Sequence, residues 1–421
     1  MLLGIFSDSH LGFPGEDRFE EAFDRFKESI DIFHKNKVDF ILHAGDLFDS
    51  AVPEQEVWLK TFKAFSQNIG QASGLNNSPG IEKSVDFLGQ FSVLIKTHFE
   101  KEFRVRVKGI PVIAIHGTHE FRGRDFANAL DVLEESHCLV HLHAGYCVLE
   151  KGGERVFVHG MGGVPEKHAR EALQKYSPKP IEGHTNILLL HQSFTDFLPF
   201  DDDSIASLSL TDLPQGFDLI INGHLHWTDE LDVDGRRFLL AGSSIFTQMK
   251  RLEAKKEKGV FLFETSSKEL TFVPFSIQRK LFYEKIEFKD ARPDEVVVRV
   301  NSLVDSYLAN NNFKIKPLIR LKLTGTLAKG FNQSDLVLDF SRYNDKAVFS
   351  VSKNIGFVDF RKKMDGLKEL HSSKKSVLDF GVEILEKNVL EAGLSDFDTR
   401  RIFELLSSGE IEKVEELLLL D

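Results

Sequence analysis

Five short apolar runs in this sequence each end in a polar side chain that can bind a divalent cation. The runs are rich in Leu, Ile and Val and then break into a loop, which is typical of buried strands. The side chains that follow the runs are Asp8 and His10, Asp46, His119, His191, and His224 with His226. One strand that ends in histidine is ordinary. Five in series predict a site, because α/β folds bind ligands at the carboxyl ends of their strands.

The residue types in this set indicate which ion would bind. Imidazole and carboxylate groups without thiolates suit borderline divalent ions such as Mn, Fe or Zn. Asp8 and His10 are separated by one residue, as are His224 and His226, so on extended backbone each pair points to one side. A carboxylate between two groups of ligands can bridge two cations, and two metals about 4 Å apart can hold a phosphodiester and activate a water. The set therefore predicts a two-metal phosphodiesterase.

The composition limits the class of protein. The 421 residues suffice for two or three domains, and 42% of them are apolar, which is enough for a large core. The net charge of −12 argues against a broad basic surface for nucleic acid, but it leaves room for a local basic strip, bound cations or a charged partner. Two cysteines exclude a disulfide scaffold and a four-cysteine zinc site. Neither a signal peptide nor a membrane-length apolar run is visible, so we expect a soluble, intracellular, cytoplasmic protein with no membrane contact.

Helix and strand patterns alternate in the first part of the chain and then give way to a run of strands. Apolar residues spaced by three and four predict helices over 17–37, 54–69 and 82–101. Strands are predicted at 2–6, 38–42, 112–115, 155–160, 186–191, 217–223, 235–242 and 259–264. This order predicts an α/β sandwich of mixed sheets that ends near residue 280. A more basic stretch follows, with the half-solvated strand pattern KIKPLIRLKLTG, and then an amphipathic tail.

The polar segments at the strand ends also carry a family resemblance. FSDSHLG, HAGDLFD, HGTHE, LLHQS and INGHLH, in this order, resemble the five motifs of the calcineurin-like metallophosphoesterases. More narrowly, DSHLG with DRFEEAFDRF, AGDLFD and AGSSIFTQMKRLEAKKEKGVFLFE resemble the archaeal DNA-repair nucleases of the meiotic-recombination-eleven family, the Mre/SbcD type. The stretch around KPLIRLKLTG is similar to that family's cap domain, and the tail is similar to its helix-loop-helix region.

This resemblance implies a fold and its division into domains. The fold would be the calcineurin-like α/β sandwich of two mixed sheets, with a small α+β cap domain and a helical C-terminal tail. Residues 1–280 would form the nuclease domain, 281–375 the DNA-binding cap domain, and 376–421 the region that binds the Rad-fifty (SbcC-type) ATPase. Helices between residues 54 and 101 would form a homodimer interface.

The resemblance also implies an activity and a role for each site residue. The chain would act on DNA double-strand ends as a 3′-to-5′ exonuclease and endonuclease with two Mn²⁺ ions per subunit. Two sets of ligands that share one carboxylate would hold the ions: Asp8, His10, Asp46 and His226, and then Asp46, His191 and His224. His119 would lie beside the scissile phosphate, where it would protonate the leaving oxygen or stabilise its charge.

Thr118 departs from the family's pattern. The family has Asn at this position, and the Asn carbonyl oxygen binds the second metal. A hydroxyl is shorter and is a poorer neutral donor, so Thr118 could bind the ion directly, bind it through a water, or not bind it. We expect a more weakly occupied second metal site rather than a lost one.

Basic side chains near the site and in the later stretch are candidates for DNA contact. Arg122 and Arg124 flank the catalytic loop and could bind phosphate, although Glu120 could neutralise them instead. A charge run is usually a solvated surface, but a local excess of cations in so acidic a chain favours contact with the DNA backbone. The candidates in that stretch are Lys353, Arg361, Lys362 and Lys363.

The sequence leaves two other functions open. The chain could be a general phosphodiesterase on small substrates, although such an enzyme needs neither a cap domain nor a helical tail. It could also be a weakly active or inactive subunit that tethers DNA ends, which Thr118 suggests and the intact His119 opposes.

Overall fold

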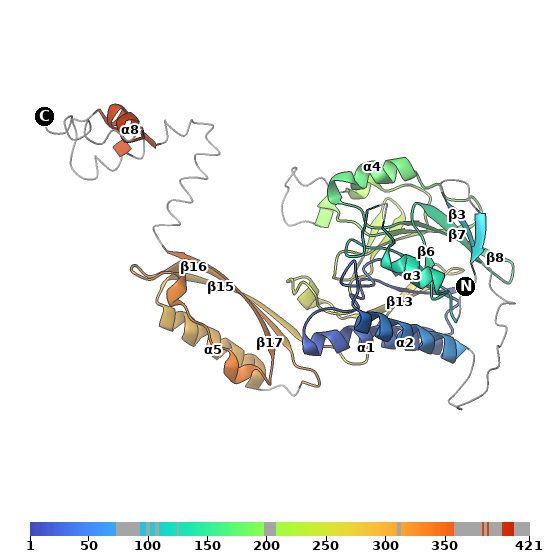
Figure 1. Cartoon of the computed structure of the whole chain (residues 1–421), viewed down its shortest axis with the longest axis horizontal. Coiled ribbons are helices and arrows are strands. Elements are labelled where there is room, and N and C mark those ends of the chain that lie inside the picture. The colour runs from blue at the N-terminus through green and yellow to red at the C-terminus, as the bar shows by residue number, and fades with distance from the viewer. Residues whose placement is uncertain are drawn as a thin grey trace. The chain divides into compact units, whose positions relative to one another are not determined.

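The computed structural model describes residues 1–72, 93–97, 102–105, 109–123, 126–197, 208–309, 313–357, 381–382, 385–386 and 398–407. The chain divides into two compact units. The first unit comprises residues 1–283 and 313–317, and the second comprises 284–312 and 318–421. Figure 1 shows the helices and strands of both units. The short return of 313–317 to the first unit has no counterpart in the predicted domain boundaries.

Two mixed sheets form the centre of the first unit. The six-stranded sheet has the order β14-β13-β1-β2-β5-β6, and its last four strands are parallel. Its strands are β1 (Leu2–Phe6), β2 (Phe40–Ala44), β5 (Val112–Ile115), β6 (Val140–His141), β13 (Gly259–Glu264) and β14 (Glu269–Pro274). The eight-stranded sheet has the order β11-β12-β10-β9-β8-β7-β3-β4. Its strands are β3 (Val93–Thr97), β4 (Glu102–Val105), β7 (Gly145–Lys151), β8 (Glu154–Met161), β9 (Thr185–Leu190), β10 (Leu219–Asn222), β11 (Asp229–Val233) and β12 (Arg236–Leu240). All eight strands that the sequence predicts in this part of the chain are confirmed.

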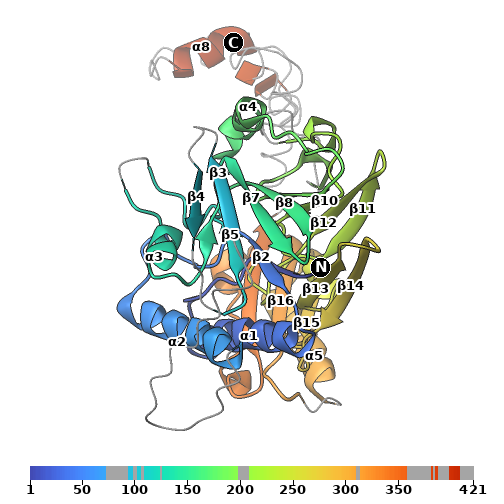
Figure 2. The ribbon, with the colours of Figure 1, turned by 90° about the vertical axis from the view of Figure 1, so that its right-hand side faces the viewer.

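The two sheets pack face to face, and helices cover their outer faces. Leu3 and Ile5 of β1 share one buried apolar cluster with Ile187 and Leu189 of β9, which places the central core between the sheets. Helices α1 (Glu16–Lys35), α2 (Gln55–Ala72) and α3 (Ala129–Glu135) pack on the six-stranded sheet, and α4 (Glu166–Tyr176) packs on the eight-stranded sheet. Figures 1 and 2 show α1 and α2 side by side, away from α4. The result is the α/β sandwich of two mixed sheets that the sequence predicts.

The apolar stripe of α1 fixes that helix on the sheet. Phe23, Phe26, Ile30 and Phe33 recur at intervals of three and four and are fully buried. Phe33 packs directly over Gly4 of β1, where any Cβ would overlap its ring. The spacing therefore predicted both the helix and the face that it buries.

The helix expected over 82–101 is wrong in its second half. Residues 93–97 form strand β3, which pairs antiparallel with β7 and with β4. The sequence VLIKT places β-branched residues at alternating positions, which favours a strand, and the edge of β7 satisfies its backbone groups. The first half of the expected helix, residues 82–92, lies outside the described residues.

The second unit is built around a three-stranded sheet of order β15-β16-β17. Its elements are β15 (Leu281–Ala291), α5 (Pro293–Ala309), β16 (Leu318–Leu327), β17 (Val348–Phe357) and α8 (Thr399–Ser407). In β16, Leu321 and Leu323 are buried while Arg320 and Lys322 are half-buried, as the pattern IRLKL predicts. None of the described helices combines the length and the apolar character that crossing a membrane requires.

Candidate metal centre

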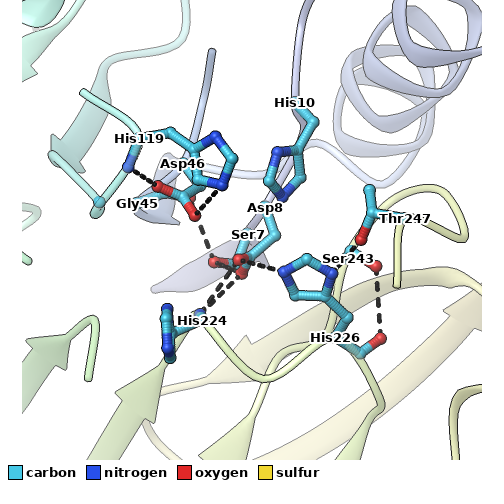
Figure 3. Close-up of polar contacts among 12 residues, drawn as sticks. Ser7, Asp8, His10, Gly45, Asp46, His119, His224, His226, Ser243 and Thr247 are labelled. Atoms are coloured by element: carbon cyan, nitrogen blue, oxygen red, sulfur yellow. Dashed lines mark hydrogen bonds and ion pairs between the residues drawn. The ribbon is translucent and has the colours of Figure 1, made fainter. Parts of the chain in front are cut away.

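The carboxyl ends of five strands from both sheets meet at one edge of the sandwich. Asp8 follows β1, Asp46 follows β2, His119 follows β5, His191 follows β9 and His224 follows β10. Hydrogen bonds donated by backbone amides join these loops. The amide of Asp8 donates to the Gly45 carbonyl at 2.9 Å, and the amide of His224 donates to Oδ1 of Asp8 at 3.1 Å. The second bond crosses from one sheet to the other (Figure 3).

Imidazole and carboxylate atoms gather at this edge into three groups, of which one is His10 with Asp49 and His119, and the other two, called the two ligand groups below, share Asp46. One group contains Asp8, His10, Asp46 and His226, all of them buried. The other contains Asp46, His191 and His224. Within each group, one ligand atom from every residue lies within 4.8 Å of the others. These are the two sets named from the sequence, and their role as metal ligands stays a prediction.

Four of these residues have left-handed backbone conformations. The φ angles are 48° at Asp8, 47° at His10, 52° at Asp46 and 71° at His224. Residues other than glycine seldom adopt positive φ, and Asp and His do so more readily than β-branched residues. Such strain collects at functional sites, where the surrounding structure holds it in place. Here it turns the side chains inward as each strand ends.

Two glycines let the loops approach these side chains closely. A Cβ at Gly45 would overlap the imidazole of His191, and Gly45 has a φ of 93°. A Cβ at Gly117 would overlap the carboxylate of Asp46. Both positions therefore require glycine if the shared carboxylate is to stay between the two groups.

The histidines are oriented by hydrogen bonds on Nδ1. In His10 this atom lies 2.9 Å from Oδ1 of Asp49, and in His191 it lies 2.7 Å from the Ala44 carbonyl oxygen. The Nε2 atoms of both histidines are buried and have no hydrogen-bond partner among the described residues. Nε2 of His191 does lie 3.1 Å from Oδ2 of Asp46, without the geometry of a hydrogen bond. A buried nitrogen without a hydrogen bond is costly, and a cation would satisfy it. The nitrogen and oxygen donors therefore fit a divalent metal.

Buried charges in the site stabilise one another. Burial alone would raise the pKa of Asp8, but attraction to His191 and His226 lowers it to about 2. Burial alone would lower the pKa of His191, but Asp46 and Asp8 raise it to about 10. Burial, followed by repulsion from His191, lowers the pKa of His224 to about 4. Asp8 is therefore ionised and His224 neutral at pH 7, which are the forms that bind a cation, whereas a cation would have to displace a proton from His191.

His119 stands at the solvent side of the two groups. Its side chain is 42% exposed, and its amide donates to Oδ1 of Asp46 at 2.8 Å. Nδ1 lies 2.8 Å from the backbone oxygen of Asp49, and Nε2 lies 3.9 Å from Oδ2 of Asp46. Thr118 is half-buried and lies between Gly117 and His119, both of which contact Asp46.

Glu120 joins two loops of the site through hydrogen bonds to its carboxylate. It is fully buried, and its two carboxylate oxygens accept hydrogen bonds from the amides of Phe48 at 2.6 Å and Gly117 at 2.7 Å. Burial, and then repulsion from Asp46, raise its pKa to about 8. Glu120 therefore does not neutralise the neighbouring arginines, as the sequence allowed, but holds the loop after β2 against the loop after β5.

Among the described residues, two of the expected DNA-contacting side chains, Arg122 and Lys353, each have a partner within their own unit. The guanidinium of Arg122 lies over the ring of Phe126 and donates to the Ala127 carbonyl. Lys353 belongs to the second unit, where Nζ donates to the Leu336 carbonyl at 2.8 Å. Arg124, Arg361, Lys362 and Lys363 lie outside the described residues.

Several residues that support the ligands were missed or left undecided by the sequence. Asp49 orients His10. Thr247 pairs with Nδ1 of His226, and Lys258 and Glu253 lie buried behind that histidine. Their sequence, TQMKRLEAKKEKG, looks like an exposed charge run, so no local signal predicts their burial.

The sequence of this chain matches a known protein family and several named proteins. Residues 1–228 match the calcineurin-like phosphoesterase family. The chain is 24% identical over 435 residues to the DNA double-strand break repair protein Mre11 of Sulfolobus acidocaldarius, over 98% of this chain and 96% of that protein. It is 25% identical over 368 residues to the protein of the same name from Thermoplasma acidophilum, over 83% of this chain and 82% of that protein.

The alignment with a plant relative covers less than half of that relative. The double-strand break repair protein MRE11 of Oryza sativa subsp. indica is 27% identical over 319 residues, which are 68% of this chain and 44% of that protein. By contrast, the two archaeal alignments extend well beyond the phosphoesterase match, and the first covers nearly the whole chain.

Proposed function

Since this chain belongs to the calcineurin-like phosphoesterase family, we propose that it is a metal-dependent nuclease for the repair of DNA double-strand breaks. One observation carries the proposal: two ligand groups share Asp46, with the Nε2 atoms of His10 and His191 buried and without hydrogen bonds. The archaeal relatives, which are named for double-strand break repair and align with most of this chain, support DNA as the substrate.

Two Mn²⁺ ions are the proposed cofactors. The first would be held by Asp8, His10, Asp46 and His226, and the second by Asp46, His191, His224 and, more weakly, Thr118. When bound, such ions neutralise charge on a phosphodiester and activate a water for in-line attack. Asp46, as the shared carboxylate, would offset the repulsion between the two cations.

His119 is the proposed catalytic residue. A carbonyl oxygen can only accept a hydrogen bond, so the contact with Asp49 places the hydrogen of His119 on Nδ1. Nε2 is then the atom that exchanges a proton, and the exposed side of the ring gives it access to substrate. In its protonated form it would donate to the leaving oxygen or stabilise the charge that develops there.

The partners follow from the same likeness. DNA ends would be cut as exonuclease and endonuclease substrates, inside the cell, and the basic stretch with Lys353, Arg361, Lys362 and Lys363 would contact the DNA backbone. The tail that contains α8 would bind a Rad-fifty (SbcC-type) ATPase, and a region that contains α2 would form a homodimer. The long alignment with the Sulfolobus protein, which includes the second unit, supports these assignments.

Mn²⁺-dependent cleavage of an end-labelled DNA duplex tests the proposal. The purified chain should cut the duplex as Mn²⁺ is added, and His119→Ala should lower the rate by roughly 10²- to 10⁴-fold, the range of general acid-base catalysis. Thr118→Asn should lower the Mn²⁺ concentration needed, because an amide carbonyl is the better neutral ligand.

Other outcomes would favour the other functions. Cleavage of a small phosphodiester without any cleavage of DNA would indicate a general phosphodiesterase. If the wild-type chain is inert at every metal concentration while Thr118→Asn cuts DNA, the second metal site has lapsed and the chain would tether ends rather than trim them.

A further inference from the structure

A buried ion pair lies behind one of the candidate ligands. Lys258 and Glu253 are only 5% and 1% exposed, and Nζ of Lys258 lies 2.9 Å from Oε1 of Glu253. Both residues lie between the loop after β12 and strand β13, in the first unit. Neither residue belongs to the two ligand groups, and the proposed reaction does not use them.

The three hydrogens of the Lys258 ammonium are all directed to buried acceptors. Besides Glu253, Nζ donates to the His226 carbonyl oxygen at 2.7 Å and to Oγ of Ser243 at 2.8 Å. An ammonium has three donors and no acceptor, so this set satisfies it completely. The lysine therefore binds the backbone of a candidate ligand and the loop next to it at the same time.

That loop, residues 241–247, is hydrogen-bonded to two residues of one ligand group, Asp8 and His226. The amide of Ser243 donates to the His226 carbonyl at 3.3 Å, and the amide of Ser244 donates to the Asp8 carbonyl at 3.2 Å. Thr247 pairs through Oγ1 with Nδ1 of His226 (Figure 3). Glu253 in turn accepts a hydrogen bond from the amide of Thr247 at 3.3 Å.

The pairing with Thr247 decides which nitrogen of His226 faces the ligand group. Nδ1 is occupied by the hydroxyl, and Nε2 is left 3.4 Å from Oδ1 of Asp8. Hydrogen bonds of this kind fix the ring orientation and the tautomer of a metal-binding histidine. Glu253 sets the position of Thr247, and Lys258 sets the positions of Glu253 and of the His226 backbone.

We propose that Lys258 and Glu253 are positioning residues for the metal held by Asp8, His10, Asp46 and His226, acting through Thr247. This inference rests on the proposed function, because it requires a metal in that group. A buried charge pair is often no more stabilising than apolar residues of similar size, so stability alone does not account for it. The proposal gives the pair a specific consequence: it should affect one of the two metal sites and leave the other unchanged.

Mn²⁺ binding to the purified full chain, measured by the electron paramagnetic resonance of free Mn²⁺, tests this without a nuclease assay. The wild-type chain should bind two ions. Thr247→Val should weaken one of them by roughly 10- to 100-fold, the usual effect of losing such a support, and leave the other unchanged. Thr247→Ser, which keeps the hydroxyl, should restore wild-type binding. Lys258→Met combined with Glu253→Gln, which leaves no unpaired buried charge, should reproduce the effect of Thr247→Val.

Arg236→Met provides the matched control. Arg236 is also buried, but its guanidinium donates to the carbonyls of Val233 and Leu213, and these residues belong to neither ligand group. This variant should lower the melting temperature and leave both Mn²⁺ affinities unchanged. Wild-type affinity in Thr247→Val, or equal weakening of both ions in the double variant, would overturn the inference alone. A wild-type chain that binds no Mn²⁺ would overturn the proposed function and this inference with it.

Discussion

Burial lowers the pKa of a histidine unless a carboxylate lies beside it, and the first unit contains both cases. His191 lies between Asp46 and Asp8, which raise its pKa to about 10 despite burial. His159 is just as deeply placed, at 2% exposure, but packs between the rings of Tyr146 and Phe217. Burial lowers its pKa to about 4. Without a metal ion, the carboxylates of the site thus favour the protonated form of His191, whereas the core favours the neutral form of His159.

The neutral His159 should make the stability of the protein depend on pH. The folded protein keeps this histidine neutral down to about pH 4, whereas the unfolded chain takes up a proton below about pH 6.5. Stability is therefore lost as the pH falls from 6.5 to 4, by about 2 kcal/mol at pH 5. His159→Leu removes the histidine and therefore this loss. The free energy of unfolding of the variant minus that of the wild type should be larger at pH 5 than at pH 7.5 by about 2 kcal/mol.

Denaturant unfolding at the two pH values would measure this change. His168→Leu is the control, because His168 is exposed on α4. If both variants respond equally to pH, the buried His159 is not the source of the effect.

At the scale of elements, the sequence predicts best those site residues whose position depends only on the end of a strand. Both ligand groups contain the residues named in advance, because each residue directly follows a strand with a clear apolar run. The helix expected over 82–101 is wrong at residues 93–97, because pairing with β7 competes with a weak helical pattern there. Lys258 and Glu253 could not be foreseen, since the burial of a charged loop depends on its tertiary path.

Glu120 joins the loop after β2 to the loop after β5, so its substitution should destabilise both loops. Glu120→Ala removes the acceptor for the buried amides of Phe48 and Gly117. Leaving them unpaired should lower the free energy of unfolding by roughly 2 to 6 kcal/mol, at about 1 to 3 kcal/mol for each amide. Thermal and denaturant unfolding would measure the loss.

Glu120→Gln is the matched variant for this prediction. Glutamine keeps one acceptor oxygen but places an NH2 group, which cannot accept, opposite the second backbone amide. This variant should therefore be destabilised less than Glu120→Ala but more than wild type. Equal destabilisation by both substitutions would show that the carboxylate needs both of its acceptor oxygens there.

At the scale of the whole molecule, charge is distributed unevenly along the chain. The net charge is −12, yet residues 318–375 contain about twice as many Lys and Arg as Asp and Glu. A DNA-binding protein of this overall charge needs such a local excess, because contacts with phosphate provide most of the affinity that does not depend on sequence. Lys353 already donates to the Leu336 carbonyl, so the lysines that follow it are the better candidates for DNA contact.

Lys362→Ala with Lys363→Ala should therefore weaken DNA binding and reduce its dependence on salt. Each lost phosphate contact lowers the slope of log K against log salt by roughly 0.9, so the double variant should lower it by roughly 1 to 2. Fluorescence anisotropy of a labelled duplex over a range of salt concentrations would measure the slope. Lys175→Ala with Lys179→Ala makes the same change in net charge at exposed positions of the first unit and should leave the slope nearly unchanged. Equal effects from the two pairs would mean that overall charge, rather than local contact with phosphate, governs binding.

Lys353→Ala should change the slope by less than either lysine of the first pair, because its ammonium is already occupied within the second unit.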